Sequence, residues 1–177
     1  MHIENLSHWS GNLNREMYLN RYGHAGIPVV VFASSGGSQN EYYDFGMIDA
    51  CSSFIEEGRV QFFTLTSVDS ESWLATWKNG HDQAEMHRVY ERYVIEEAIP
   101  FIKHQTGWFD GMMTTGCSMG AYHAVNFFLQ HPDVFTKVIA LSGVYDARFF
   151  VGDYYNDDVI YQNSPVDYIW NQNDGWF

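Results

Sequence analysis

Short, continuous apolar runs alternate along the chain with longer segments in which apolar residues recur every three or four positions. Two of the runs are PVVVFA at 28–33 and VQFFTL at 60–65, both rich in β-branched or aromatic residues. Runs of this length and composition predict strands that are buried on both faces of a sheet. The same pattern predicts further strands at 17–22, 112–117 and 138–142.

Three segments between these strands have helical periodicity. The first, 38–58, opens with Ser-Gln-Asn-Glu, the order of a capping box, and ends at a glycine. The second runs from 82 to about 105 and contains Pro100, which predicts a kink. The third, 119–130, directly follows a predicted strand. Residues 143–177 are rich in Tyr, Asn and Asp and predict a loop with a short helix or two.

The alternation of strands with helices predicts the fold class. Helices of this length between successive strands favour an α/β fold, a three-layer αβα sandwich with a mostly parallel sheet. No repeat, low-complexity tract or linker divides the sequence, so we expect a single domain over residues 1–177.

Composition narrows the classes of partner. Hydrophobic residues make up 46% of the chain, as in globular proteins, and the net charge is −13. This negative charge argues against nucleic acid and anionic membranes as partners. Cys51 and Cys117 are too few for a disulfide scaffold or a cysteine metal site, and we expect no metal or cofactor. With no signal sequence and no run of about 18 apolar residues, we expect a cytoplasmic protein.

The segment Gly-Cys-Ser-Met-Gly at 116–120 carries the most specific chemical signal. It matches G-x-S-x-G and lies between a predicted strand and a predicted helix, the context in which this motif forms a nucleophile elbow. Side chains two positions before and after the serine would collide at such a turn, which explains the two glycines. The following helix directs its N-terminus at the site and favours a developing oxyanion there.

Three segments resemble one branch of the α/β-hydrolases. GCSMGAYHAVNFFLQHPDVFTKVIALSG, at 116–143, is similar to the elbow, helix and next strand of the esterase branch that includes S-formylglutathione hydrolases, feruloyl esterases and mycolyltransferases. PVVVFASSGGSQNEYYDF, at 28–45, resembles the oxyanion strand and loop of that branch, and 90–102 resembles its helix before the elbow. The resemblance covers roughly residues 15–170 and implies the α/β-hydrolase fold.

The resemblance also implies an activity and its residues. Ser118 would be the nucleophile of a carboxylesterase that hydrolyses small-molecule esters through an acyl-enzyme. The oxyanion hole would combine the Met119 amide with the amide of Gly36, or of Ser35 or Gly37 next to it. Two alternatives stay open: an acyltransferase that uses the same acyl-enzyme, and a non-catalytic binding module of the same fold.

The serine needs a base, and the sequence does not supply the usual one. In this fold the order along the chain is Ser, then Asp or Glu, then His, but none of the eight histidines follows His131. His123 lies on the helix that leads away from the elbow, and we expect His81 and His87 at the surface or in loops. Asp146 follows a strand and is a candidate acid, although a loop or helix-cap role is the preferred interpretation.

By the resemblance, a further strand, the acid, another helix and the histidine would follow the segment SPVDYIWN at 164–171, in roughly 70 more residues. The C-terminal strands and the histidine loop are therefore expected to be missing, either by truncation or in a naturally short, inactive relative. The strand at 138–142 would then be an open edge. We expect a homo-oligomer formed through that edge, or a companion C-terminal fragment.

Overall fold

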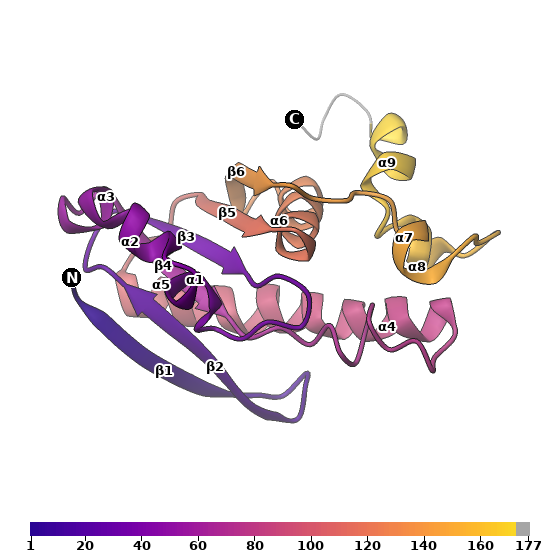
Figure 1. Cartoon of the computed structure of the whole chain (residues 1–177), viewed down its shortest axis with the longest axis horizontal. Helices are drawn as coiled ribbons and strands as arrows, with labels where there is room; N and C mark the ends of the chain where they lie inside the picture. Colours follow the sequence, from indigo (N-terminus) through magenta and orange to yellow (C-terminus); the bar gives the residue numbers. More distant parts are fainter. Residues whose placement is uncertain (173–177) are drawn as a thin grey trace.

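The computed structural model describes residues 1–172, and its centre is a six-stranded sheet (Figure 1). The strand order is β1-β2-β4-β3-β5-β6. β4, β3, β5 and β6 run parallel, while β1 and β2 pair antiparallel with their neighbours. The strands are β1 (Ile3–Ser10), β2 (Arg15–Tyr22), β3 (Ile27–Phe32), β4 (Val60–Leu65), β5 (Met112–Cys117) and β6 (Phe135–Leu141). The predicted α/β class with a mostly parallel sheet is confirmed.

Helices cover both faces of the sheet, which gives the predicted three layers. One face packs against α4, α5 and α6, and α4 lies along the length of the molecule (Figure 1). The other face packs against three short helices, α1 to α3. Short helices α7 to α9 and a 3₁₀ turn follow β6. The helices are α1 (Glu41–Asp44), α2 (Met47–Ala50), α3 (Ser52–Glu56), α4 (Gly80–Arg92), α5 (Ile99–Thr106), α6 (Met119–Gln130), α7 (Arg148–Val151), α8 (Asp158–Tyr161), α9 (Pro165–Tyr168) and the turn Ile169–Asn171.

The central strand β3 shows why a continuous apolar run is needed there. Val30 and Phe32 point into the core beneath α4 to α6, whereas Val29 and Val31 point into the core beneath α1 to α3. All four side chains are at most 3% exposed. A strand covered on both faces has no polar side, so its sequence does not alternate.

The strand β1 was not predicted, and its side-chain pattern explains why. Its inward positions are mostly polar, with Glu4, His8 and Ser10 on the inner side, while Ile3 and Trp9 are 47% and 62% exposed. The hydrophobic alternation that marks a half-buried strand is therefore absent. β1 is held by its complete antiparallel register with β2, from Ile3 opposite Tyr22 to Ser10 opposite Arg15.

The predicted single helix over 38–58 is wrong, because the segment forms three short helices. Gly46, at φ 77°, breaks the segment between α1 and α2, and Gly58, at φ 68°, follows α3. The expected capping box does not form. The Glu41 carboxylate instead accepts hydrogen bonds from the backbone N–H and the hydroxyl of Ser34, at 2.9 and 2.8 Å.

The long helix around Pro100 contains a π-helical segment. It begins at Gly80, where the Asn79 side chain accepts a hydrogen bond from the Asp82 amide, and passes through π-helical residues Tyr93–Ala98 before α5. Proline has no amide hydrogen, and its ring clashes with the carbonyl four residues earlier in an α-helix. The π-helical residues, whose turns are wider than those of an α-helix, end two positions before this proline.

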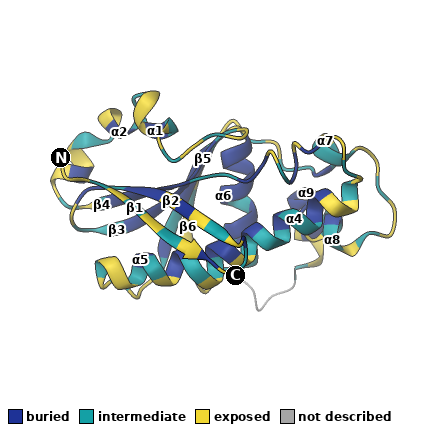
Figure 2. Ribbon diagram, turned by 90° about the horizontal axis from the view of Figure 1, so that it is seen from below, coloured by how far each residue is buried: buried dark blue, intermediate teal, exposed yellow. Residues whose placement is uncertain are grey.

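The strand β6 lies at the edge of the described sheet and is only partly covered (Figure 2). It begins at Phe135, three residues before the predicted start. On the face shared with α1 to α3, Ile139 and Leu141 are 52% and 37% exposed. Between them and the helices lies an apolar cavity of about 430 Å³, whose lining also includes Tyr42 and Met113. The helices α1 to α3 therefore leave the β5–β6 side of this face open.

Candidate active site

Ser118 occupies the turn between β5 and α6. Its backbone angles, φ 56° and ψ −117°, lie in a region that non-glycine residues rarely adopt. The turn is fixed at both ends: the Ser118 amide donates to the Leu141 carbonyl of β6, and its carbonyl accepts from the Ala121 and Tyr122 amides of α6. The side chain is exposed, and its hydroxyl has no hydrogen-bond partner among residues 1–172. We call this strand-to-helix turn, Gly116 to Gly120, the elbow.

The two glycines of the motif are required by direct backbone contact. A Cβ atom on Gly116 would lie 2.2 Å from the carbonyl carbon and oxygen of Gly120. A Cβ atom on Gly120 would lie 2.2 Å from the Phe32 carbonyl oxygen of β3. The helix α6 therefore starts in contact with the strands beneath it, and its buried Ala121 and Ala124 continue that close approach.

The loop after β3 lies beside the elbow and contains the three candidates for the second oxyanion donor. The Gly36 amide donates to Asp69 Oδ2 at 3.2 Å, and the Gly37 amide donates to the Ser34 carbonyl at 2.7 Å. The Ser35 amide makes no hydrogen bond within the described part of the chain, and Ser35 lines a cavity together with Ser118 and Met119. In this arrangement the Gly36 amide faces a carboxylate rather than the cavity.

A small cavity of about 90 Å³ adjoins Ser118. Apart from Ser35, Ser118 and Met119, its walls are apolar, and two phenylalanines come from α7. The helix α7 is held against α9 by a bidentate ion pair between Arg148 and Asp167, at 2.6 and 2.8 Å. The remaining lining residues are Leu74, Val144, Phe149 and Phe150. The cavity is large enough for a small apolar group of a ligand that binds next to Ser118.

None of the eight histidines, all within the described chain, forms a hydrogen bond with the Ser118 hydroxyl. His123, on α6, is buried, and its Nε2 lies 2.8 Å from Asp69 Oδ1 in a hydrogen bond. The expected surface position of His87 is wrong: this residue is 1% exposed, and its ring stacks on His123 at 5.2 Å. Burial holds the pKa of His87 well below its ordinary value, so the ring is neutral.

The other titratable candidates are engaged elsewhere. His81 is exposed as expected and pairs with Asp157 at 2.8 Å, and this hydrogen bond raises the pKa of His81. Asp146 Oδ1 accepts a hydrogen bond from the Arg148 amide at the start of α7. Asp146 therefore lies in the loop before α7, whose N-cap is Ala147, and this is the loop role that was one of the two preferred interpretations of Asp146.

Two carboxylates near the elbow were not singled out from the sequence. Glu41 holds Ser34, and Asp69 holds Gly36, so the loop between them is fixed from both sides. A positional signal for Asp69 exists, because it follows β4, and the C-terminal ends of parallel strands form the usual ligand-binding edge. For Glu41 the sequence predicts a place in a capping box, and that capping box does not form.

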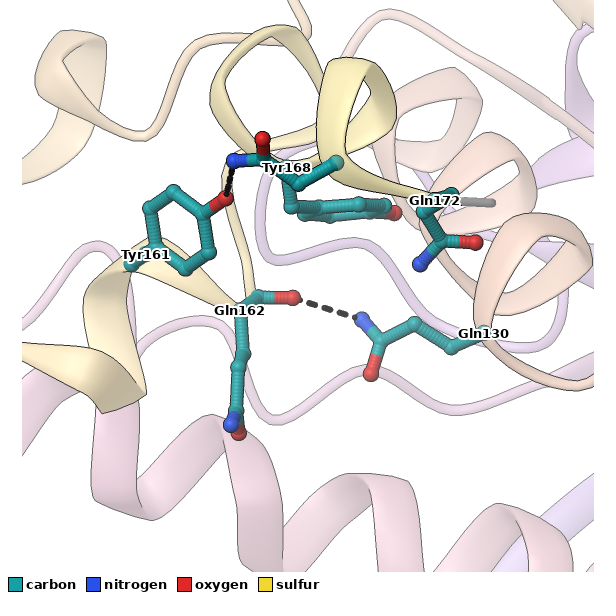
Figure 3. A pocket seen from close by; sticks show the side chains of 6 residues that line it. Gln130, Tyr161, Gln162, Tyr168 and Gln172 are labelled. Atoms are coloured by element: carbon teal, nitrogen blue, oxygen red, sulfur yellow. Dashed lines mark hydrogen bonds between the residues drawn. The ribbon is translucent and has the colours of Figure 1, made fainter.

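A larger cavity, of about 300 Å³, lies away from this chemistry (Figure 3). Gln130, at the C-terminal end of α6, lines it together with Tyr161, Gln162 and Tyr168. Gln130 is the twelfth residue of α6, so it lies about 18 Å along the helix from Ser118. The lining extends to Gln172, the last described residue, and contains no acid, base or nucleophile suited to ester chemistry.

Two general features concern the whole described chain. Residues 1–172 contain no cluster of three or more His, Cys, Asp or Glu side chains arranged to hold a metal ion. In the same residues, no helix is both long enough and apolar enough to cross a membrane.

Comparisons with known proteins agree with this fold. The chain has a TM-score of 0.72 to a ferulic acid esterase at 16% identity, covering 98% of this chain and 73% of that one. It has a TM-score of 0.71 to an S-formylglutathione hydrolase from Agrobacterium tumefaciens at 17% identity, covering 99% and 72%. For an S-formylglutathione hydrolase from Staphylococcus aureus the TM-score is 0.65 at 16% identity, covering 96% and 70%.

At these identities the structural likeness establishes the fold, and family membership comes from the sequence pattern. No curated protein matches the chain. The pattern of the family described as "Putative esterase" matches residues 10–177, nearly the entire sequence. The chain therefore belongs to this esterase family, whose fold here is that of the α/β-hydrolases.

Proposed function

We propose that this chain is a serine carboxylesterase in which Ser118 is the nucleophile. The observation that carries the proposal is the backbone of Ser118, which is strained, lies at the N-terminus of α6 and presents an exposed hydroxyl beside a cavity. Strained backbone of this kind persists only where the surroundings enforce it, and such residues cluster at active sites. Membership of the esterase family supports the same reaction class.

The chemistry follows from this placement. The Ser118 oxygen attacks the ester carbonyl carbon while a base takes the hydroxyl proton, and the carbonyl oxygen becomes an oxyanion. The oxyanion would be stabilised by the Met119 amide at the start of α6 and by an amide of the 34–37 loop. Collapse breaks the bond to the alkoxy group, which leaves with the proton, and water then hydrolyses the acyl-enzyme by the same steps in reverse.

The cavity beside Ser118 limits the acyl group. A cavity of about 150 Å³ accepts benzene, whereas the space here is about 90 Å³ and mostly apolar. We therefore propose esters of short acyl groups, of about two to four carbons, as substrates. A longer acyl chain would have to displace Phe149 or Phe150 of α7.

No base for Ser118 is identified, and this favours one alternative, a non-catalytic binding module. None of the eight histidines forms a hydrogen bond with the Ser118 hydroxyl, so a general base for this serine would have to come from outside them. If no base is supplied, the same geometry describes a non-catalytic module that binds a small carbonyl compound. Transfer of the acyl group to an alcohol instead of water would use the same acyl-enzyme.

Ester hydrolysis by the 177-residue chain tests the proposal. With p-nitrophenyl acetate we expect slow hydrolysis only, since an oxyanion hole without a base retains only residual catalysis. The part of that rate that passes through Ser118 should be lost in Ser118→Ala, and peptide mass mapping of the wild type should find acetyl on Ser118. A control variant, Ser53→Ala on the exposed side of α3, should keep the rate.

Two results would contradict parts of this proposal. An unchanged rate in Ser118→Ala, with no acetyl on the elbow peptide, would remove Ser118 as the nucleophile. Rapid turnover by protein of the confirmed 177-residue mass would show that a base is present, and His81, His87 and His123 would be the residues to substitute next.

A further inference from the structure

We propose that Asp69 is a positioning residue of this site: it holds the 34–37 loop in the shape that presents the Ser35 amide, rather than the Gly36 amide, to an oxyanion on Ser118. The inference rests on the proposed function of Ser118. The role of Asp69 is indirect. It acts through the hydrogen bond of 3.2 Å that its Oδ2 accepts from the Gly36 amide.

Asp69 is placed to act as a rigid anchor. It is 1% exposed, its amide donates to the Ser67 hydroxyl at 2.9 Å, and its other carboxylate oxygen pairs with His123 of α6. Burial alone would raise the pKa of this carboxyl, but the charge of His123 and hydrogen bonds from His123, Ser67 and Gly36 lower it. One buried carboxylate thus joins the loops after β3 and β4 to the helix that starts at Ser118.

The loop is clamped on both sides of one peptide group. Before it, the backbone N–H and hydroxyl of Ser34 donate to Glu41. After it, the Gly36 amide donates to Asp69, with Gly36 at φ 67°, a conformation suited to glycine. The peptide between these clamps carries the Ser35 N–H, which has no partner within residues 1–172 and belongs to a residue of the cavity wall.

This arrangement separates two roles that the sequence left combined. The resemblance predicts the Gly36 amide as the oxyanion donor, with the amides of Ser35 and Gly37 as alternatives. In the structure the amides of Gly36 and Gly37 already have acceptors, so using either would break a hydrogen bond in the loop. The Ser35 amide has no such cost, and preorganised donors of this kind are the ones that stabilise an oxyanion most.

A boronic acid provides a test that does not need the missing base. Ethylboronic acid adds to a serine oxygen to form a tetrahedral boronate: the Oγ–B bond forms and the hydroxyl proton is released to solvent. The adduct places a boron-bound oxygen where the oxyanion would be. We expect wild-type protein to bind it, measured by calorimetry, and Ser118→Ala to show no binding.

Asp69 variants then test the positioning role. Asp69→Ala should weaken boronate binding by about 10- to 100-fold, approaching the loss of one oxyanion donor. Asp69→Asn retains an oxygen for the Gly36 amide and a group that can pair with a His123 tautomer, so it should bind within about threefold of wild type. Asp110→Asn, at an exposed position before β5, is the matched control.

A second measurement separates failure of this inference from failure of the proposed function. Hydrogen exchange of a peptide covering residues 33–38 should be faster in Asp69→Ala than in wild type, while exchange in α4 is unchanged. If wild-type protein binds no boronate, the proposed function is wrong, and the exchange result still tests whether Asp69 holds the loop. Folded Asp69→Ala that binds like wild type, or exchanges like wild type in this peptide, would overturn the positioning role.

Discussion

Replacing Ser118 with glycine should stabilise the protein while removing the proposed nucleophile. Ser118 adopts φ 56° and ψ −117°, and a non-glycine residue held in such a region costs about 1–3 kcal/mol. Glycine adopts these angles without a Cβ clash but loses about 0.4–1 kcal/mol more backbone entropy on folding. The hydroxyl accepts and donates no hydrogen bond within residues 1–172, so no compensating interaction is lost.

The expected net gain is therefore about 1 kcal/mol in the free energy of unfolding, or roughly 2–4 °C in Tm for a chain of this size. Urea denaturation followed by circular dichroism at 25 °C measures it. Ser118→Ala keeps the strain and should stay within about 0.5 kcal/mol of wild type. Ser53→Gly, at an exposed position of α3, should lose about 0.5 kcal/mol because glycine is a poor helix former.

The sign of the Ser118→Gly effect is the decisive result. If this variant is as stable as wild type or less stable, while Ser53→Gly shows its usual loss, the backbone at the elbow is not strained. Backbone strain would then no longer connect Ser118 with a function.

Three further predictions concern packing, pH and association. Gly120→Ala should lower the free energy of unfolding by about 1–3 kcal/mol, because the new Cβ would lie 2.2 Å from the Phe32 carbonyl oxygen, and an unchanged urea midpoint would contradict that contact. The folded-state pKa of His87 is far below its ordinary value, so below about pH 6.5 the unfolded chain binds a proton that the folded protein does not. The free energy of unfolding should therefore fall from pH 7 to pH 5, by up to about 1.4 kcal/mol per pH unit. Denaturation at several pH values measures this slope, and His87→Phe should flatten it. The open edge at β6 should cause self-association at micromolar concentration, which sedimentation detects and Ile139→Lys should reduce. A clean wild-type monomer with no companion fragment would rule out this association.

Features that depend on local sequence were predictable, and those that depend on distant partners were not. Three elements have the predicted bounds: the strands at 60–65 and 112–117 and the helix at 119–130. Their bounds are set by apolar runs and by the Gly-x-Ser-x-Gly turn, which are patterns of a few neighbouring residues. β1 depends on pairing with β2 rather than on its own polarity pattern. The Glu41 carboxylate has an equally good acceptor role in a capping box and on Ser34, and only the path of the loop decides between them.

The same distinction applies to the site. Ser118 and Met119 could be located from the motif, since a strand-to-helix turn determines their geometry. The hydrogen-bond partners of Asp69, Gly36 and His123, lie 33 and 54 residues away in the chain. No local sequence pattern predicts contacts between residues so far apart. The buried position of His87 was missed for a related reason: its aromatic neighbours Trp73 and Tyr122 come from other segments.

The central position of β3 has a consequence for the order in which the molecule assembles. β1 and β2 are neighbours in sequence and can pair early, but Val29 of β3 pairs with Met113 of β5, 84 residues further along the chain. Closing so long a loop has a high entropic cost before any contact repays it. The Gly120 backbone contacts β3, and Ser118 directly follows β5. The turn at Ser118 therefore cannot take its final shape until β5 has paired with β3. The turn at Ser118 is thus expected to be among the last features to form in folding. A partly unfolded molecule should lose this turn while much of the β1–β2 hairpin remains paired.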